Sequence, residues 1–209
     1  MKTGICIAMP EEAETLLKLF RIDREEPDNL YGNAAFYETD NVVVAIGGVG
    51  ELASAMATQA LITVYGCQSV INAGCCGCTG NKYHIGDIYS VNKVYKGDVD
   101  MRIIGYDLYQ VPGHPVCLEP EVDPDYPTAI CRSSDRFIVS GSGIPPQTLT
   151  EMEGYSVAYV CYEYGVPCRL YKVISDMCDR NVDSSEYQEN VVDTCNELGK
   201  HLYNILMRH

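Results

Sequence analysis

Three carboxylates stand where acid–base chemistry could be placed. Glu12 follows an apolar run in the stretch AMPEE, Glu153 lies in EMEG near an expected helix start, and Asp176 closes the apolar run YKVISD. Carboxyl groups gathered in one site can act as general acid and general base. Each also has a structural interpretation. Glu12 at a helix start could simply interact with the helix dipole, Glu153 could be a solvated helix residue, and Asp176 could cap a helix.

A cluster of thiols and glycines fills residues 71–78, INAGCCGC. The spacing Cys75-x-x-Cys78 is that of half a zinc site, but no second C-x-x-C follows, and a redox pair would open a helix. The four histidines are scattered, at positions 84, 114, 201 and 209. With Gly74 and Gly77, the pattern favours a glycine turn that carries thiols, while a metal site and a redox pair stay as alternatives.

Alternating strands and helices must position these residues. Apolar runs predict strands at 3–9, 34–40, 41–50, 68–74, 86–98, 128–140 and 166–176. Helical spacing predicts helices at 11–20, 51–66, 149–165 and from about 184 to the C-terminus. Residues 105–130, rich in Pro, Gly and Tyr, predict a long ordered loop. The alternation indicates a mostly parallel or mixed sheet with helices on both faces.

The ends of the expected strands predict the position of a pocket, because ligands bind beyond the carboxyl ends of strands in such sheets. Polar or glycine-rich segments fall at four such ends: Met9–Glu12, Gly47–Gly50, Gly74–Gly77 and Ser175–Asp176.

Composition limits the class of protein and of partner. The 209 residues suit one domain, 1–209, with a substantial core. The net charge of −14 repels phosphate backbones and anionic lipid, so nucleic acid and membrane are poor partners. The first residues, MKTGICIAMPEE, indicate a strand rather than a signal peptide. The eleven cysteines then indicate reduced thiols, several of them buried, in a cytoplasmic enzyme.

Together these motifs resemble those of the methylthioadenosine/S-adenosylhomocysteine nucleosidases, within the purine nucleoside and uridine phosphorylase family. The matching segments are GICIAMPEEAETLL (4–17), AIGGVGELASAMATQALI (45–62), VINAGCCG (70–77), IGDI (85–88), GYDLYQVPGHP (105–115), EMEGYSVAYVCYEYGVP (151–167) and KVISDMCD (172–179). The resemblance implies a three-layer α/β/α domain with a central mixed β-sheet, usually a homodimer. It also implies a small nucleoside substrate and no metal or organic cofactor.

The resemblance assigns the chemistry to the three carboxylates. Asp176 would protonate N7 of the leaving adenine, Glu12 would activate the attacking water, and Glu153 would hold the ribose hydroxyls above Met152. Such a glycoside hydrolysis needs one protonated and one ionised carboxyl group. An aspartic acid that stays protonated needs desolvation or a nearby like charge.

Further substrate contacts follow from the same resemblance. In the segment SSDRF, residues 133–137, Phe137 would stack on the purine and Ile138 would give it backbone contacts. A frame shifted to VSGSGI (139–144) would remove the phenylalanine, and Phe137 could instead be ordinary core. The other expected contacts are Ala8, Met9, Val49, Cys75 and Ser175. Tyr106 and Pro112 would reach the 5′ pocket of the neighbouring subunit.

The chain departs from the family pattern in three places. Cys75 stands where serine is usual, and a thiol is the weaker hydrogen-bonding group. Ile104 stands where an aromatic residue is common. The helix that normally follows the proline-rich loop in the family has no room in residues 117–131.

Hydrolysis is expected rather than phosphorolysis. Related phosphorylases hold phosphate with arginines, and neither Ala45-Ile46 nor Ile71-Asn72 contains one. A phosphorylase or hydrolase for another nucleoside is an alternative, as are a noncatalytic nucleoside-binding protein and a cysteine-based redox or metal protein.

Overall fold

The computed structural model of the chain describes residues 1–22, 26–141, 143–178 and 184–207. Of the residues singled out above, Ser142, Asp179 and His209 lie outside these ranges. The strands are β1 (Thr3–Ile7), β2 (Asn29–Tyr31), β3 (Ala34–Glu38), β4 (Val42–Ile46), β5 (Ser69–Cys78), β6 (Ile88–Lys96), β7 (Thr128–Ser133), β8 (Thr148–Glu151) and β9 (Cys168–Met177). The helices are α1 (Pro10–Leu19), α2 (Glu51–Thr63), α3 (Gly154–Tyr164) and α4 (Ser184–Met207), with a 3-10 turn η1 (Arg102–Ile104).

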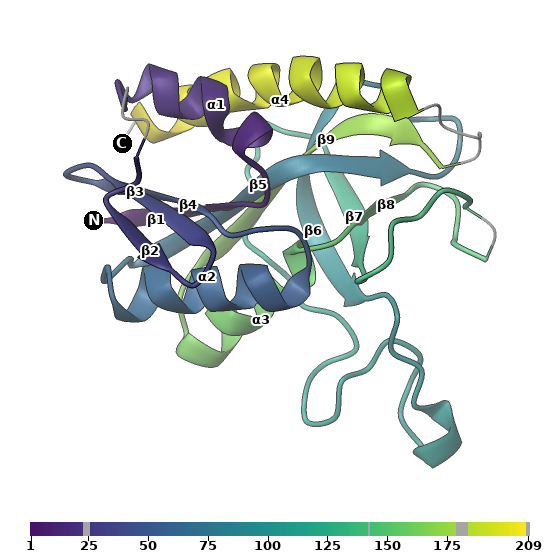
Figure 1. Cartoon of the computed structure of the whole chain (residues 1–209). Coiled ribbons are helices and arrows are strands. Elements are labelled where there is room, and N and C mark those ends of the chain that lie inside the picture. Colours follow the sequence, from purple (N-terminus) through teal and green to yellow (C-terminus); the bar gives the residue numbers. More distant parts are fainter. Residues whose placement is uncertain (23–25, 142, 179–183, 208–209) are drawn as a thin grey trace.

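The strands form one mixed sheet between two helical layers. Their order is β2-β3-β4-β1-β5-β8-β7-β6-β9. Helix α1 packs against α4 on one face, and α2 packs against α3 on the other (Figure 1). The predicted three-layer α/β/α fold with a central mixed sheet is confirmed.

Part of the sheet closes on itself, because β5 also pairs with β9. Strands β5, β8, β7, β6 and β9 thus form a closed ring of pairings. Along β5, strand β1 pairs with residues 69–72 and β8 pairs only with residues 77–78. Among the described strands, none pairs with residues 73–76 between them on that edge, and this interruption is where the site is built.

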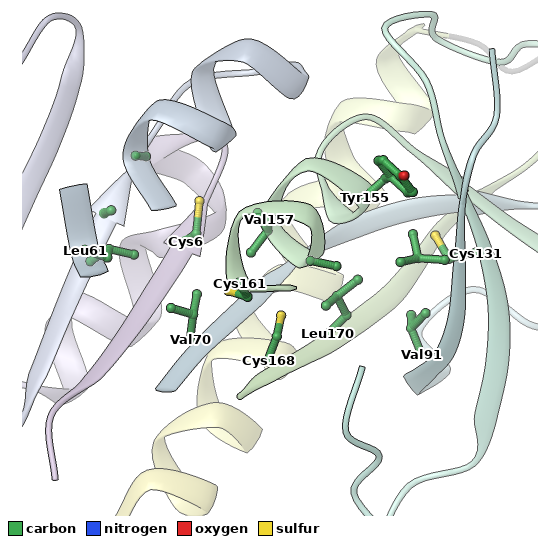
Figure 2. Close-up of a cluster of buried hydrophobic side chains, with 14 of the residues drawn as sticks. Cys6, Leu61, Val70, Val91, Cys131, Tyr155, Val157, Cys161, Cys168 and Leu170 are labelled. Atoms are coloured by element: carbon green, nitrogen blue, oxygen red, sulfur yellow. The ribbon is translucent and has the colours of Figure 1, made fainter. Parts of the chain in front are cut away.

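The core occupies both faces of the sheet because successive strand side chains point to opposite sides. In β1, Ile5 and Ile7 pack with Leu16 of α1, whereas Cys6 packs with Leu61 of α2. Figure 2 shows labelled cysteines among valines, leucines and a tyrosine on the α2/α3 face. Nine of the cysteines are buried, which confirms that several act as small apolar side chains.

Three predictions of local structure are wrong. Residues 71–78 do not form a turn, because β5 continues through them to Cys78 and pairs with β9. The predicted helix 149–165 is a strand followed by a helix, since β8 is fully buried between β5 and β7. The predicted strand 128–140 ends at Ser133. The predicted helix end at Gly165 is confirmed, with a left-handed φ of 65°.

No helix in the described ranges has both the length and the apolar character needed to cross a membrane.

Candidate active site

A cavity lies at the carboxyl ends of β1, β5 and β9, where the sequence predicts ligand binding. It is lined by Ala8, Met9, Glu12, Val49, Cys75, Cys76, Gly77, Arg136, Phe137, Ile138, Thr150, Glu151, Met152, Glu153, Ser175 and Asp176. All the expected substrate contacts line it except Tyr106 and Pro112.

Glu12 is fixed at the start of α1 by two backbone donors. Pro10 opens the helix, and Glu12 reaches back so that its Oε2 accepts a hydrogen bond of 3.1 Å from the Met9 amide. Its Oε1 accepts a hydrogen bond of 2.9 Å from the Cys75 amide. That amide lies in the stretch of β5 between the partners β1 and β8. The interruption in pairing therefore supplies a donor that holds a buried carboxylate.

The two glycines of INAGCCGC make room for carboxylates rather than for a turn. A Cβ at Gly74 would lie 2.8 Å from Oε1 of Glu12. A Cβ at Gly77 would lie 2.8 Å from Oδ2 of Asp176 and 2.6 Å from Sγ of Cys178. Glycine therefore lets the backbone of β5 approach both acids closely.

Asp176 is held on the other side of β5 in an environment that favours its neutral form. It is only 4% exposed near the end of β9. Ser175 donates a hydrogen bond of 2.8 Å to its Oδ1. Burial raises the pKa of Asp176, and the Ser175 hydrogen bond offsets part of that effect.

Glu153 joins the start of α3 to the glycine loop before α2. Its Oε1 accepts a hydrogen bond of 2.8 Å from the Gly50 amide. Gly50 has a φ of 97°, which favours glycine there. Burial, together with the neighbouring charge of Glu151, raises the pKa of Glu153 to about 7. A carboxyl group of this kind can accept or donate hydrogen bonds to hydroxyl groups near neutral pH.

A buried ion pair, which the sequence analysis missed, supports this arrangement. Lys172 Nζ lies 2.8 Å from Glu151 Oε2, and both side chains are almost fully buried. Glu151 Oε2 also accepts hydrogen bonds from the Glu153 and Gly154 amides, so the pair fixes the start of α3. Burial alone would raise the pKa of Glu151, but the charge of Lys172 lowers it. A lone lysine in the apolar strand YKVISD was the available signal, since a buried lysine requires a partner.

The loop after β7 forms another part of the cavity wall. Phe137 and Ile138 line the cavity, and Phe137 is 46% exposed, so it is not ordinary core. Arg136 also lines the cavity, although it lies outside the segments 45–46 and 71–72 in which a phosphate-binding arginine was sought.

Cys75 is the thiol of the INAGCCGC cluster that lies beside the Glu12 carboxylate. Its sulfur, a Glu12 oxygen and the sulfur of Cys195 on α4 all lie within 4.8 Å of one another. A hydrogen bond with Cys195, burial and the charge of Glu12 raise the pKa of the Cys75 thiol well above its ordinary value. Among the described residues this is the one group of three or more potential metal-ligating side chains.

Tyr106 and Pro112 lie outside this cavity. Both belong to the segment between β6 and β7, which projects from the body of the domain (Figure 1).

The arrangement gathers acids with different surroundings around one cavity. Glu12 is held by backbone N–H groups, Asp176 is desolvated beside a hydroxyl, and Glu153 has a pKa near neutrality. Such a set can give a proton to one side of a substrate and take one from the other.

Known proteins with similar sequences match almost the whole chain. The phosphorylase superfamily matches residues 2–145 and 143–208. A 5′-methylthioadenosine/S-adenosylhomocysteine nucleosidase of Buchnera aphidicola is 29% identical, over 99% of this chain and 97% of its own. An aminodeoxyfutalosine nucleosidase of Helicobacter pylori is 29% identical, over 88% of this chain and 89% of its own.

Solved structures give the same result. The crystal structure of a Helicobacter pylori 5′-methylthioadenosine/S-adenosyl homocysteine nucleosidase is similar with a TM-score of 0.88 and 26% identity. The match covers 100% of this chain and 99% of that one, and that crystal contains a pyrrolidin-3-ol bearing a 4-amino-pyrrolopyrimidine and a propynylthio group. The chain belongs to the phosphorylase superfamily and, within it, is an enzyme of the nucleosidase kind.

Proposed function

We propose that the protein hydrolyses the N-glycosidic bond of 5′-substituted adenine nucleosides, such as methylthioadenosine and S-adenosylhomocysteine. The products would be adenine and the 5′-substituted ribose. The observation that carries the proposal is the pair of buried carboxyl groups, Glu12 and Asp176, in one cavity but in different environments.

Each acid has one role in the reaction. As the glycosidic bond breaks, its electron pair passes to the base, and Asp176 gives its proton to N7. Water attacks the anomeric carbon and loses a proton to Glu12, which Cys75 and Met9 orient through their amides. Burial favours the protonated form of Asp176 that this step requires.

The sugar occupies the space between these two acids. Glu153 accepts hydrogen bonds from the ribose hydroxyls, and Met152 packs beneath the ring. Phe137 stacks on the purine, while the backbone of Ile138 contacts it. Val49, Ala8 and Ser175, which also line the cavity, complete the wall around the substrate.

Water is the proposed nucleophile because carboxylates surround the position of attack. Glu12, Glu151 and Glu153 line the cavity, and the buried cation Lys172 is already paired with Glu151. A phosphate dianion near these groups would be repelled. Arg136 is exposed at the mouth of the cavity and lies in the loop assigned to the purine.

A second substrate follows from the relatives. The identity to the aminodeoxyfutalosine nucleosidase equals that to the methylthioadenosine/S-adenosylhomocysteine nucleosidase. Aminodeoxyfutalosine is therefore the second candidate substrate, and Glu12 and Asp176 have the same roles in both proposals.

A cytoplasmic homodimer is part of the proposal. Leu52 and Met56 of α2 and Ile103 of η1 are apolar and mostly exposed. A second copy covering them would bring a projecting segment, with Tyr106 and Pro112, towards the 5′ end of the pocket. Sedimentation of the wild type and of Leu52→Glu tests this interface; a monomeric wild type would contradict it.

One incubation tests the reaction. Methylthioadenosine, S-adenosylhomocysteine, aminodeoxyfutalosine, adenosine and inosine are each incubated with the enzyme, with and without phosphate, and free base is measured. We expect adenine from methylthioadenosine at a rate that phosphate does not change. Phosphate-dependent release with a sugar 1-phosphate product would refute hydrolysis, and cleavage of aminodeoxyfutalosine alone would select the second substrate.

A further inference from the structure

Three separate elements bring the donor atoms of Glu12, Cys75 and Cys195 together. Glu12 comes from α1, Cys75 from β5 and Cys195 from the middle of α4. Their ligand atoms all lie within 4.8 Å of one another. Cys195 is only 1% exposed and lies behind the cavity wall, whereas Glu12 and Cys75 line it.

The donor set suits a borderline-soft divalent cation. Two sulfurs and one carboxylate oxygen could fill three of the four tetrahedral positions around Zn²⁺, with the fourth left open. Thiolates disfavour Mg²⁺ and Ca²⁺, which prefer oxygen ligands. Each oxygen of Glu12 accepts a single backbone hydrogen bond, so lone pairs are left for a metal.

The site also has an entry route and a fixed geometry. A cation entering the cavity meets Glu12 and Cys75 at its wall. The backbone amides of Met9 and Cys75 already orient the carboxylate, and α1 packs directly on α4, which carries Cys195. Only the thiol protons, which pass to solvent, must leave as the metal binds.

We propose that Glu12, Cys75 and Cys195 form a Zn²⁺ site that inhibits the enzyme reversibly. A bound cation would occupy the lone pairs with which Glu12 accepts a proton from water, so Zn²⁺ and catalysis exclude each other. The inhibitory part rests on the proposed function, whereas metal binding does not. The pair differs from Cys75-x-x-Cys78, since Cys195 is supplied by a distant helix.

Metal binding is tested without substrate. Co²⁺ is added to the full-length protein in a phosphine reductant, and thiolate-to-cobalt charge-transfer absorption is recorded before Zn²⁺ displaces the cobalt. We expect one such site per chain in the wild type. Changing a residue that only supports a metal ligand weakens metal affinity by about 10- to 100-fold. Cys195→Ser removes a ligand, so it should weaken binding by at least that much. Cys75→Ser should do the same, which keeps the test decisive if Cys195→Ser does not fold.

Cys168→Ser is the matched control. Cys168 is buried and hydrogen-bonded to a second thiol, Cys161, on the α2/α3 face of the sheet (Figure 2). Neither residue lines the cavity. We expect Cys168→Ser to bind Co²⁺ and Zn²⁺ as the wild type does. If Cys168→Ser abolishes binding, or if Cys195→Ser and Cys75→Ser leave it unchanged, the site is elsewhere and the proposal is wrong.

Inhibition is measured with any nucleoside that the enzyme cleaves. Zn²⁺ should inhibit the wild type and Cys168→Ser, and a chelator should restore the rate. Cys195→Ser, compared with its own metal-free rate, should resist the same Zn²⁺ concentration. Binding without inhibition would overturn the inhibitory part. An enzyme that cleaves no nucleoside would refute the proposed function and leave the binding result standing.

Discussion

Glu12 and Asp176 approach the same strand, each beside a glycine of β5, but their surroundings differ. The carboxylate of Glu12 lies against Gly74 and accepts hydrogen bonds from two backbone amides. The carboxyl group of Asp176 lies against Gly77 and receives one hydroxyl hydrogen bond in a buried site. Two amide donors suit a charged carboxylate, whereas burial with one hydroxyl donor and one weak thiol donor, Cys178, suits a protonated one.

Under the proposed function, this difference would let one strand hold a base and an acid close together. Neither residue has a neighbouring cation in its hydrogen bonds; the lysine of the site serves Glu151 instead. Burial is what favours the protonated form of Asp176. The following changes test whether this division is real.

The largest effect is expected from removing the acid or the base at constant size. Asp176→Asn and Glu12→Gln should each lower kcat by about 10²- to 10⁴-fold, because each removes one proton transfer. A riboside with a nitrophenolate leaving group separates them, since this group departs without protonation. It should restore turnover to Asp176→Asn but not to Glu12→Gln. Equal behaviour of the two variants on this substrate would contradict the assignment.

The glycines should show the same division with a smaller effect. A methyl group at Gly74 or Gly77 would overlap a carboxylate oxygen, and such overpacking costs about 1–3 kcal/mol of stability. Turnover by Gly77→Ala should recover on the nitrophenyl substrate more than turnover by Gly74→Ala does. Thermal unfolding of both variants checks the stability loss, and wild-type stability in either would show that the strand can yield.

The stability of the fold should depend on pH through Asp176. Burial raises its pKa in the folded state above the ordinary value of 3.8, so the folded chain holds the proton longer than the unfolded chain. This contribution is complete below 3.8 and is lost as pH rises through the folded pKa. The free energy of unfolding of Asp176→Asn should therefore rise relative to that of the wild type as the pH increases from acid to alkaline values. Urea unfolding at several pH values measures it; a constant difference would contradict the shift.

The smallest effect is expected from Ser175. Its hydrogen bond lowers the pKa of Asp176, so Ser175→Ala should raise it further. Because the proposed reaction needs protonated Asp176, the alkaline limb of the kcat profile should move to higher pH. One hydrogen bond limits the shift to about one pH unit. A downward movement would show that Ser175 acts otherwise.

The sequence was sufficient to place most of the cavity. Apolar runs that end in AMPEE and YKVISD put Glu12 and Asp176 at strand ends, and such ends converge in this kind of sheet. The helix boundary at Gly165 was also predictable, since a left-handed C-terminal residue favours glycine.

What the sequence did not reveal depends on contacts between distant segments. A glycine in a sequence can mark either a positive φ or a close approach of the backbone to another group. Only the carboxylates from α1 and β9 show that Gly74 and Gly77 allow a close approach. The partner of Lys172 lies on another strand, β8. Cys195 belongs to an apolar stripe of α4, which predicts burial but not its contact with Cys75.

The closed ring of strands has a consequence for how the protein unfolds. Strands β5 and β9 are members of the ring, so their pairing cannot shift by one residue without breaking the pairing with other strands. Such a shift would also turn every side chain of the strand to the opposite face of the sheet. In the described sheet, β2 is the outermost strand; it is three residues long and exposed. Amide hydrogen exchange should therefore begin at β2 and reach β5 and β9 last, so that the edge can open while Gly74 and Gly77 stay against their acids.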